Sequence, residues 1–431
     1  MLHALRAVNT YMPTRSRLLG LAAASLAASL AAALAFAWRR RLREARRLRA
    51  KDHMRLGNAL ARGGKLERAL VHYGSAAELN PQSANAHHNA ASICQRLHRF
   101  DEAVRHYEAA LLIKPAHLES ASNLAVALLN DKRPAEAVGA CRRALEIEAA
   151  SGGFNSEAFH HLNVALRLCG RRAAAVDETW RQLGMLDPAF RRPAAVVVDG
   201  PAAGSATAAP APLTVVCVKW GKLYGAEYVN KLARGVLRHL GERLVTRFVC
   251  FTDDPTGLIA QVEARPLPER PEWQGWWFKA CLFSAEAALR GRILYLDLDT
   301  VLSGSLVPLA AYNGGFALLA AADFNAEEGN ADGYNSSVML WDAGGGSDAP
   351  LRQLHDAIAP EVFRCLMRWD HWVEMVVPRA TLLQRELPGL CVDYKSACAE
   401  SGPPAGAAVV CFPRAPKPHE VEADWVREHW C

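Results

Sequence analysis

The chain has 431 residues, which predicts two or three domains because one hydrophobic core seldom serves so long a chain. Apolar residues make up 51% and charged residues 22% of the sequence, proportions typical of a folded protein. The formal net charge is +6, but residues 39–51 alone contain eight Lys or Arg and one Glu. The remainder is close to neutral, so the charge argues against a nucleic-acid partner.

Residues 1–17 form an N-terminal tail, and residues 18–38 form an uncharged run of 21 residues. As a helix this run would be about 30 Å long, which matches the hydrocarbon core of a bilayer. The run therefore predicts a transmembrane helix and a single-pass membrane protein. More Arg and Lys follow it than precede it, which favours the cytoplasm for the later domains. The lumen of the secretory pathway is the alternative.

Two other interpretations of the same segment stay open. Ala35-Phe36-Ala37 resembles a cleavage site, which would make the run a signal peptide that is removed. The first 43 residues contain no acidic residue and several Arg and Ser, which is also typical of a transit peptide.

Residues 50–188 repeat with a period of 34. Small, aromatic and proline residues recur at that spacing: Ala69, Ala103 and Ala137; Ala76, Ala110 and Ala144; Tyr73 and Tyr107; Pro81 and Pro115. The pattern resembles the tetratricopeptide repeat, in which each unit is a pair of antiparallel helices. A weaker fourth unit covers residues 157–188, with Trp180 in the aromatic position. The resemblance implies an all-α superhelix whose groove binds a protein partner, or a helical spacer.

A linker, residues 189–212, is rich in Ala, Pro and Gly, and the sequence pattern changes after it. Residues 213–218, 247–251 and 292–296 are short apolar runs that are typical of buried strands. Residues 228–240 have helical spacing between them. Strands that alternate with helices predict an α/β domain over the last half of the chain.

Acidic residues follow two of these strands, at the sheet edge where α/β proteins bind ligands. Asp253 follows the second strand, and Asp297 and Asp299 follow the third. Two carboxylates two residues apart are expected on the same side, where a divalent cation and a diphosphate would neutralise them. The alternative is that one Asp caps a helix and the other is solvated.

Three segments in the last half of the chain carry a more specific resemblance. Residues 294–301, which read LYLDLDTV, look like the D-x-D strand of GT-A-fold glycosyltransferases similar to glycosyltransferase family 8. Residues 334–340, YNSSVML, and residues 412–419, FPRAPKPH, resemble two further motifs of that family. The resemblance covers residues 213–431 and implies a metal-dependent hexosyltransferase that uses a nucleotide-sugar donor and retains the anomeric configuration.

The resemblance also implies roles for individual residues. Mn²⁺ or Mg²⁺ would be bound by Asp297 and Asp299, with His419 as a third candidate ligand. The acceptor side would hold Asp370 and His371 as catalytic candidates. The donor would be bound by a larger set of polar and aromatic residues, namely Trp277, Lys279, Asp297, Asn335, Ser336 and Lys417.

Two positions depart from the family pattern. Cys411 stands where the family has its last metal ligand, a His, and a thiolate suits Mn²⁺ or Mg²⁺ poorly. Arg414 replaces a glycine in the same loop, so the backbone approaches a phosphate less freely, although the Arg itself is able to bind one.

The sequence therefore predicts a glycosyltransferase that moves a sugar to an acceptor hydroxyl on a glycan, protein or lipid, with repeats that bind a protein. The alternative is a non-catalytic, membrane-tethered repeat scaffold with a degenerate transferase domain, which the two departures favour. A likeness to the repeat-bearing transferases that modify Ser and Thr rests on domain order alone. The eleven cysteines have no zinc-type spacing and are expected to be reduced and mostly buried.

Overall fold

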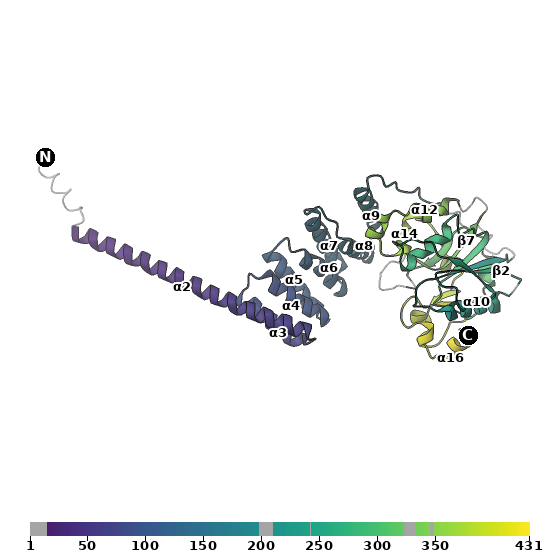
Figure 1. Ribbon diagram of the computed structural model, residues 1–431, viewed down its shortest axis with the longest axis horizontal. Coiled ribbons are helices and arrows are strands. Elements are labelled where there is room, and N and C mark those ends of the chain that lie inside the picture. Colours follow the sequence, from purple (N-terminus) through teal and green to yellow (C-terminus); the bar gives the residue numbers. More distant parts are fainter. Residues whose placement is uncertain (1–14, 198–209, 242, 323, 325–332, 345–348) are drawn as a thin grey trace. The chain divides into compact units, whose positions relative to one another are not determined.

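The chain folds into two compact units, Met1–Phe154 and Asn155–Cys431, each described here by itself (Figure 1). The residues that the computed structural model describes are 15–197, 210–241, 243–322, 324, 333–344 and 349–431. Most of the predicted N-terminal tail and residues 198–209 of the predicted linker lie outside them.

The described part of the first unit is helical, and short turns join one helix to the next. Its helices are α2 (Arg15–Arg62), α3 (Leu66–Leu79), α4 (Ala84–Arg96), α5 (Phe100–Ile113), α6 (Leu118–Asn130) and α7 (Pro134–Ala149). The predicted helical repeats over this part of the chain are confirmed.

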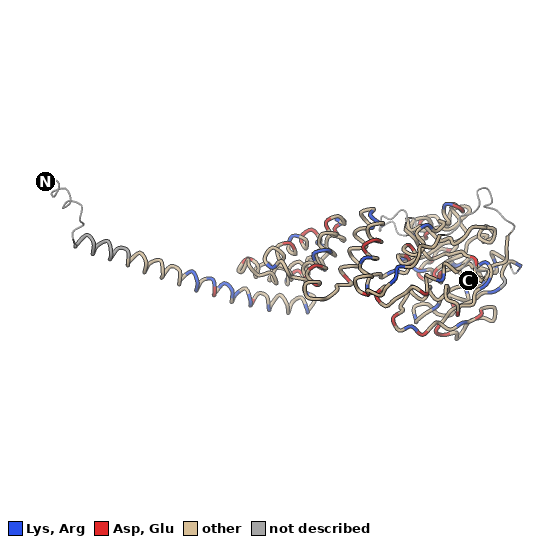
Figure 2. The backbone as a smooth tube through the Cα atoms, turned by 90° about the horizontal axis from the view of Figure 1, so that it is seen from above, with Lys and Arg blue, Asp and Glu red and all other residues tan. Residues whose placement is uncertain are grey.

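The structure corrects the prediction of a transmembrane helix over residues 18–38. Within the described residues, no helix has both the length and the apolar character that a bilayer crossing requires. Instead α2 continues through the apolar run and the basic segment, whose Arg and Lys are blue in Figure 2, into the first repeat. Side chains are described only from residue 26 onward, where Ala and Ser dilute the leucines and the basic residues follow at Arg39. The single-pass membrane prediction is therefore wrong.

The turn between the two helices of each repeat needs a left-handed backbone. Gly64, His98 and Lys132 have φ values of 72°, 58° and 61° and lie 34 residues apart. Gly170, with a φ of 69°, continues the series after a four-residue insertion. A left-handed residue is costly unless it is glycine, so its recurrence at non-glycine positions shows that the helix pairing dictates the turn.

Close packing explains why small residues recur in the repeats. The Tyr73 ring is buried against Ala69, Ala90 and Ile93, and its hydroxyl donates to Asn58. Gly57 of α2 faces this ring so closely that an added Cβ would lie 2.7 Å from a ring carbon. The helix pair is therefore able to approach only because residue 57 has no side chain.

Gly57→Ala is expected to destabilise the first unit by about 1–3 kcal/mol, because the buried Tyr73 ring has no room to yield. The matched control is Gly74→Ala in α3, where nothing lies within 4 Å of the new methyl group. That control should stabilise by about 0.5–1 kcal/mol through helix propensity. Urea unfolding followed by circular dichroism measures both, and two stabilising substitutions would contradict the packing argument.

The second unit begins with two helices and continues as an α/β fold. In chain order, its main elements are α8 (Ser156–Leu168), α9 (Arg172–Leu186), β1 (Leu213–Lys219), α10 (Ala226–Leu240), β2 (Val245–Thr252), β3 (Val262–Pro266), η1 (Gly275–Phe283), β4 (Gly291–Leu296), β5 (Thr300–Leu302), α11 (Val307–Ala311), β6 (Ala317–Ala320) and β7 (Tyr334–Ala343). After β7 follow η3 (Ala349–Arg352), α12 (Gln353–Asp356), α13 (Pro360–Cys365), α14 (Trp369–Val376), β8 (Thr381–Leu382), α15 (Leu383–Glu386), β9 (Cys391–Asp393), η4 (Tyr394–Cys398), β10 (Val409–Cys411), η5 (Pro418–Glu420) and α16 (Asp424–His429). The three predicted strands and the predicted helix are confirmed.

The strands of the second unit form two mixed sheets. The seven-stranded sheet has the order β3-β2-β1-β4-β7-β6-β8, and the smaller one the order β5-β10-β9. The chain runs outward from β1 to β3 and then returns to place β4 parallel to β1 on its other side. Such a reversal of strand order opens a crevice at the carboxyl ends of β1 and β4. The predicted α/β architecture is confirmed.

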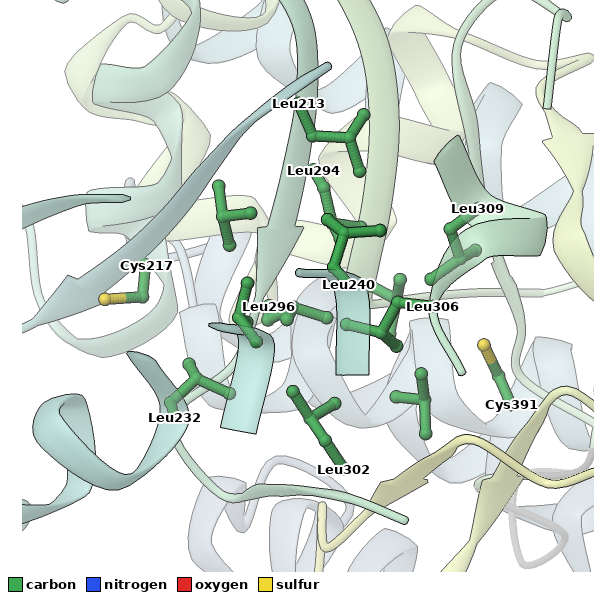
Figure 3. Packing of buried hydrophobic residues seen from close by; sticks show 14 of the residues in the cluster. Leu213, Cys217, Leu232, Leu240, Leu294, Leu296, Leu302, Leu306, Leu309 and Cys391 are labelled. Atoms are coloured by element: carbon green, nitrogen blue, oxygen red, sulfur yellow. The ribbon is translucent and has the colours of Figure 1, made fainter. Parts of the chain in front are cut away.

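The main core of this unit lies between the seven-stranded sheet and α10 (Figure 3). Leu213 and Leu294 from neighbouring strands are fully buried there, together with Leu232 of α10 and Leu306 before α11. Each buried leucine stabilises the fold by roughly 1.5–3 kcal/mol. This core keeps β1 and β4 in register, and so it positions the residues that follow them.

Candidate functional site

A cavity of about 1000 Å³ opens at the crevice between β1 and β4. Trp220 follows β1, and Asp297 and Asp299 follow β4, and all three line the cavity. Eight of the predicted site residues line this one space, whereas Trp220 was not predicted: Trp277, Lys279, Asp297, Asp299, Asn335, Ser336, Asp370 and Lys417.

Asp297 is held by two neighbours and by the strand beside it. Its backbone N–H donates to the Ser337 carbonyl at 2.9 Å, which continues the pairing of β4 with β7. The Tyr295 hydroxyl donates to Oδ1 at 2.6 Å, and the Lys279 ammonium lies 2.8 Å from the same oxygen. The carboxylate is thus fixed, and one positive charge compensates it.

Asp299 has a separate countercharge. The Lys417 ammonium lies 2.7 Å from Oδ2, and the Tyr224 hydroxyl donates to that oxygen at 3.0 Å. Burial raises the pKa of Asp299, the neighbouring Asp297 adds to the rise, and Lys417 opposes it. Each of the two carboxylates in this cavity is therefore paired with its own lysine, and the two lysines come from distant segments.

Lys279 links Asp297 to Ser336 of β7. It is 5% exposed, and its ammonium donates to the Ser336 carbonyl at 3.1 Å and to the Ser336 Oγ at 3.0 Å, besides Asp297. Asn335 also lines the cavity, and its Oδ1 accepts from the Ser337 N–H at 2.9 Å. Lys279 is therefore a structural bridge as well as a cavity residue.

The two adjacent tryptophans of η1 differ in exposure. Trp277 is 4% exposed, donates to the Met367 carbonyl at 3.2 Å and packs against Phe363 and Trp369. Trp276 is 56% exposed and lines the cavity. Trp276 therefore offers an open aromatic face, while Trp277 mainly packs in the core.

The catalytic candidates Asp370 and His371 lie in different places: Asp370 at the cavity and His371 in the core. Asp370 lines the cavity, and its Oδ1 accepts from the Ser336 N–H at 3.1 Å. His371 is buried at the next position of α14 and is not among the cavity residues, because consecutive helical side chains diverge by about 100°. Burial lowers the pKa of His371 well below its ordinary value, and the nearby Arg167 reinforces the shift.

The third predicted metal ligand, His419, is engaged elsewhere: its Nδ1 contacts the Tyr228 hydroxyl. Among the residues that the structure describes, no three His, Cys, Asp or Glu side chains are placed to hold a metal ion. The structure does not bring His419 together with Asp297 and Asp299, and its metal role stays a prediction. The metal role of the two acids stays a prediction.

The two departures from the family pattern lie in β10 of the smaller sheet and in the loop that follows it. Cys411 of β10 is 1% exposed, and burial raises the pKa of its thiol well above the ordinary value, which disfavours the thiolate form. Arg414 donates to the buried Asp393 at 3.2 Å while lining the cavity. All eleven cysteines lie in the described residues and have free thiols, as predicted.

Comparison with known proteins identifies the helical repeats. One family model, "TPR repeat", matches residues 57–97, and another, "Tetratricopeptide repeat", matches residues 84–117. Residues 57–117 are tetratricopeptide repeats (TPRs). No curated protein sequence matches the chain. The glycosyltransferase resemblance of residues 213–431 stays a prediction.

Solved TPR structures are similar to part of the chain. YrrB, a TPR protein with an unusual peptide-binding site, is 24% identical, with 32% of this chain and 68% of that chain covered and a TM-score of 0.28. The first TPR of Spaghetti, bound to an HSP90 peptide, is 24% identical over 28% of this chain and 91% of its own, with a TM-score of 0.26. MamA is 16% identical over 32% of this chain and 79% of its own, with a TM-score of 0.29.

Several cavity residues were missed by the sequence analysis. Tyr224 and Tyr295 donate hydrogen bonds to the two acids, and Trp220 gives the cavity an aromatic wall. His160 of α8 also lines the cavity, although the sequence places it in a fourth TPR. One signal was present: His160 lies five residues after the N-cap Asn155, as His88 lies five after the N-cap Ser83. His88 contacts Ser120 of the next repeat, so this position faces inward.

His371→Gln is expected to make stability less sensitive to acid. Burial depresses the folded-state pKa, so the imidazole is neutral in the native protein and gains a proton on unfolding below about pH 6.5. That linkage leaves stability unchanged above pH 6.5 and removes about 1.4 kcal/mol at pH 5.5. Urea unfolding at pH 5.5, 6.5 and 7.5 should show this loss in the native chain and not in the variant. His98→Asn, at an exposed position, is the control and should keep the loss that the native chain shows between pH 7.5 and pH 5.5.

Proposed function

We propose that the second unit is a GT-A-type glycosyltransferase domain, which transfers a hexosyl group from a nucleotide-diphosphate donor to an acceptor hydroxyl. The observation that carries the proposal is the arrangement of Asp297 and Asp299 at the end of β4, in a cavity at the reversal of strand order, with Lys279 and Lys417 beside them. The motifs of residues 294–301 and 334–340 supply two sides of that cavity, which supports the resemblance.

The two acids fit a divalent cation, Mn²⁺ or Mg²⁺. Carboxylate oxygens are the ligands such ions prefer, and these ions commonly bind through one or two carboxylates while substrate phosphates and water complete the shell. A third protein ligand is therefore not required of this site. When bound, the cation would supply positive charge to the diphosphate. Asp297 and Asp299 are the residues that would hold it.

The chain's own residues would orient and stabilise the leaving group. Lys417 is 22% exposed at its side chain, so its ammonium is able to turn from Asp299 toward a diphosphate and compensate the charge that develops there. Asn335 and Ser336 border the same space and offer hydrogen bonds to the donor sugar. Trp276 offers a flat apolar surface for a sugar or a base.

The first unit is proposed to bind a polypeptide partner. TPR helices stack so that one face forms a concave groove, and that groove commonly takes an extended peptide. Such a groove would bring a protein partner or a protein acceptor to the chain.

A non-catalytic scaffold is the second candidate, and specific observations favour it. The Cys411 side chain is buried, burial raises the pKa of its thiol, and Arg414 is paired with Asp393. Both residues stand where the family binds metal or phosphate. Under this alternative the cavity would bind a ligand without turning it over.

Asp299→Asn is expected to abolish sugar transfer by the full chain. Loss of this carboxylate removes charge that the donor complex needs and should lower turnover at least about a hundredfold. The assay follows donor consumption with a panel of nucleotide sugars and Mn²⁺. Asp424→Asn, an exposed acid on α16, is the matched control and should keep full activity. Unchanged activity in Asp299→Asn would overturn the mechanism, and nucleotide binding without turnover in the native chain would favour the scaffold.

A further inference from the structure

A buried glutamate joins the two N-terminal helices of the second unit to the cavity strand. The Glu374 side chain is 1% exposed, and its Oε2 contacts the guanidinium of Arg167 in α8. Arg172 of α9 donates from Nε to the same oxygen at 3.3 Å. The other oxygen, Oε1, accepts the backbone N–H of Tyr334 at 3.0 Å. Three segments far apart in the sequence therefore meet at one carboxylate.

Helix α14 presents a second carboxylate one turn earlier, on the same face. Asp370 accepts the backbone N–H of Ser336 at 3.1 Å, as Glu374 accepts that of Tyr334. The two acids thus hold alternate amides at the start of β7. Asn335, which borders the cavity, lies between the two held positions. The conformation of this donor-side segment depends on both carboxylates.

The ion pair is poorly explained by stability alone. Arg167 is 2% exposed, and its Nε and Nη2 have no hydrogen-bond partner among the described residues. A buried pair with unsatisfied donors often contributes no more stability than apolar side chains of similar volume. What the guanidinium does supply is direction, because its contact with Oε2 holds the Glu374 side chain with Oε1 at the Tyr334 amide.

We propose that Arg167 of the repeat helix α8 is a positioning residue for the donor site, acting through Glu374 on the segment Tyr334–Ser336. The proposal rests on the proposed transferase function. Ser336 in turn accepts two hydrogen bonds from Lys279, which pairs with Asp297. A shift of the segment would therefore reach the acids. The repeat helices α8 and α9 belong to the working site, beyond any role as a tether.

Hydrogen exchange in the ligand-free full chain tests the positioning step without any activity. Arg167→Met should speed exchange of the Tyr334 and Ser336 amides at least about fivefold, while β1 and β4 stay protected. The matched control is Arg171→Met, which removes an exposed arginine directly before α9. It should leave the exchange of both amides unchanged. Unchanged exchange in Arg167→Met would overturn the proposal. Equal acceleration across the whole unit would also overturn it, because the pair would then serve global stability.

A donor assay tests the functional step. Arg167→Met should raise the donor KM at least about fivefold with a smaller change in kcat, and Arg167→Lys should restore part of the difference. A normal KM despite faster exchange would overturn the link to the donor site. Arg167→Met combined with Glu374→Gln removes the fully buried pair and leaves Arg172, whose side chain is 22% exposed, so the double variant should fold and still show the raised KM. If the native chain binds no nucleotide sugar, the proposed transferase function is wrong. The hydrogen-exchange result would still decide whether Arg167 positions the segment Tyr334–Ser336.

Discussion

The arrangement of the second unit depends on compensating two acids at the tip of a buried strand. Asp297 and Asp299 directly follow β4, and both are held by backbone hydrogen bonds: the Asp297 N–H continues the pairing with β7, and the Asp299 carbonyl accepts the Phe412 N–H. Each has its own lysine, Lys279 from η1 and Lys417 from the loop after β10. Both segments must return to the same crevice, so the electrostatics of one strand tip constrains parts of the chain 138 residues apart, the difference between positions 279 and 417.

The sequence predicts those features whose cause is local. Continuous apolar runs mark β1, β2 and β4, and the D-x-D spacing places two acids at the end of β4. The position of the two acids at the cavity could therefore be predicted from neighbouring residues in the sequence. Predictions failed where the direction of a side chain on its helix decides whether it reaches the cavity. His371 and Asp370 are neighbours in sequence, but the helix turns one into the core and leaves the other at the cavity. The apolar run before Arg39 predicted a membrane span, but the composition of those 21 residues does not show that α2 continues through them into the first repeat.

Other features have no local signal at all. Arg167 lies in what reads as an ordinary repeat helix, and its partner Glu374 is 207 residues later. Nothing in the 34-residue period predicts that the last helix pair of the repeat region packs with the α/β fold. His160 shows the same difficulty, since its position in the repeat predicts an inward-facing side chain and leaves open what it faces.

These contacts change where the folding unit begins. The pattern of sequence suggests a boundary in the Ala- and Pro-rich linker before Leu213, but a chain starting there would lack Arg167 and Arg172. Glu374 would then lose both of its guanidinium partners together with the helices that carry them. The compact unit that starts at Asn155 is thus the smallest one in which the strand Tyr334–Ala343 keeps all its anchors, and the repeat helices are part of its architecture.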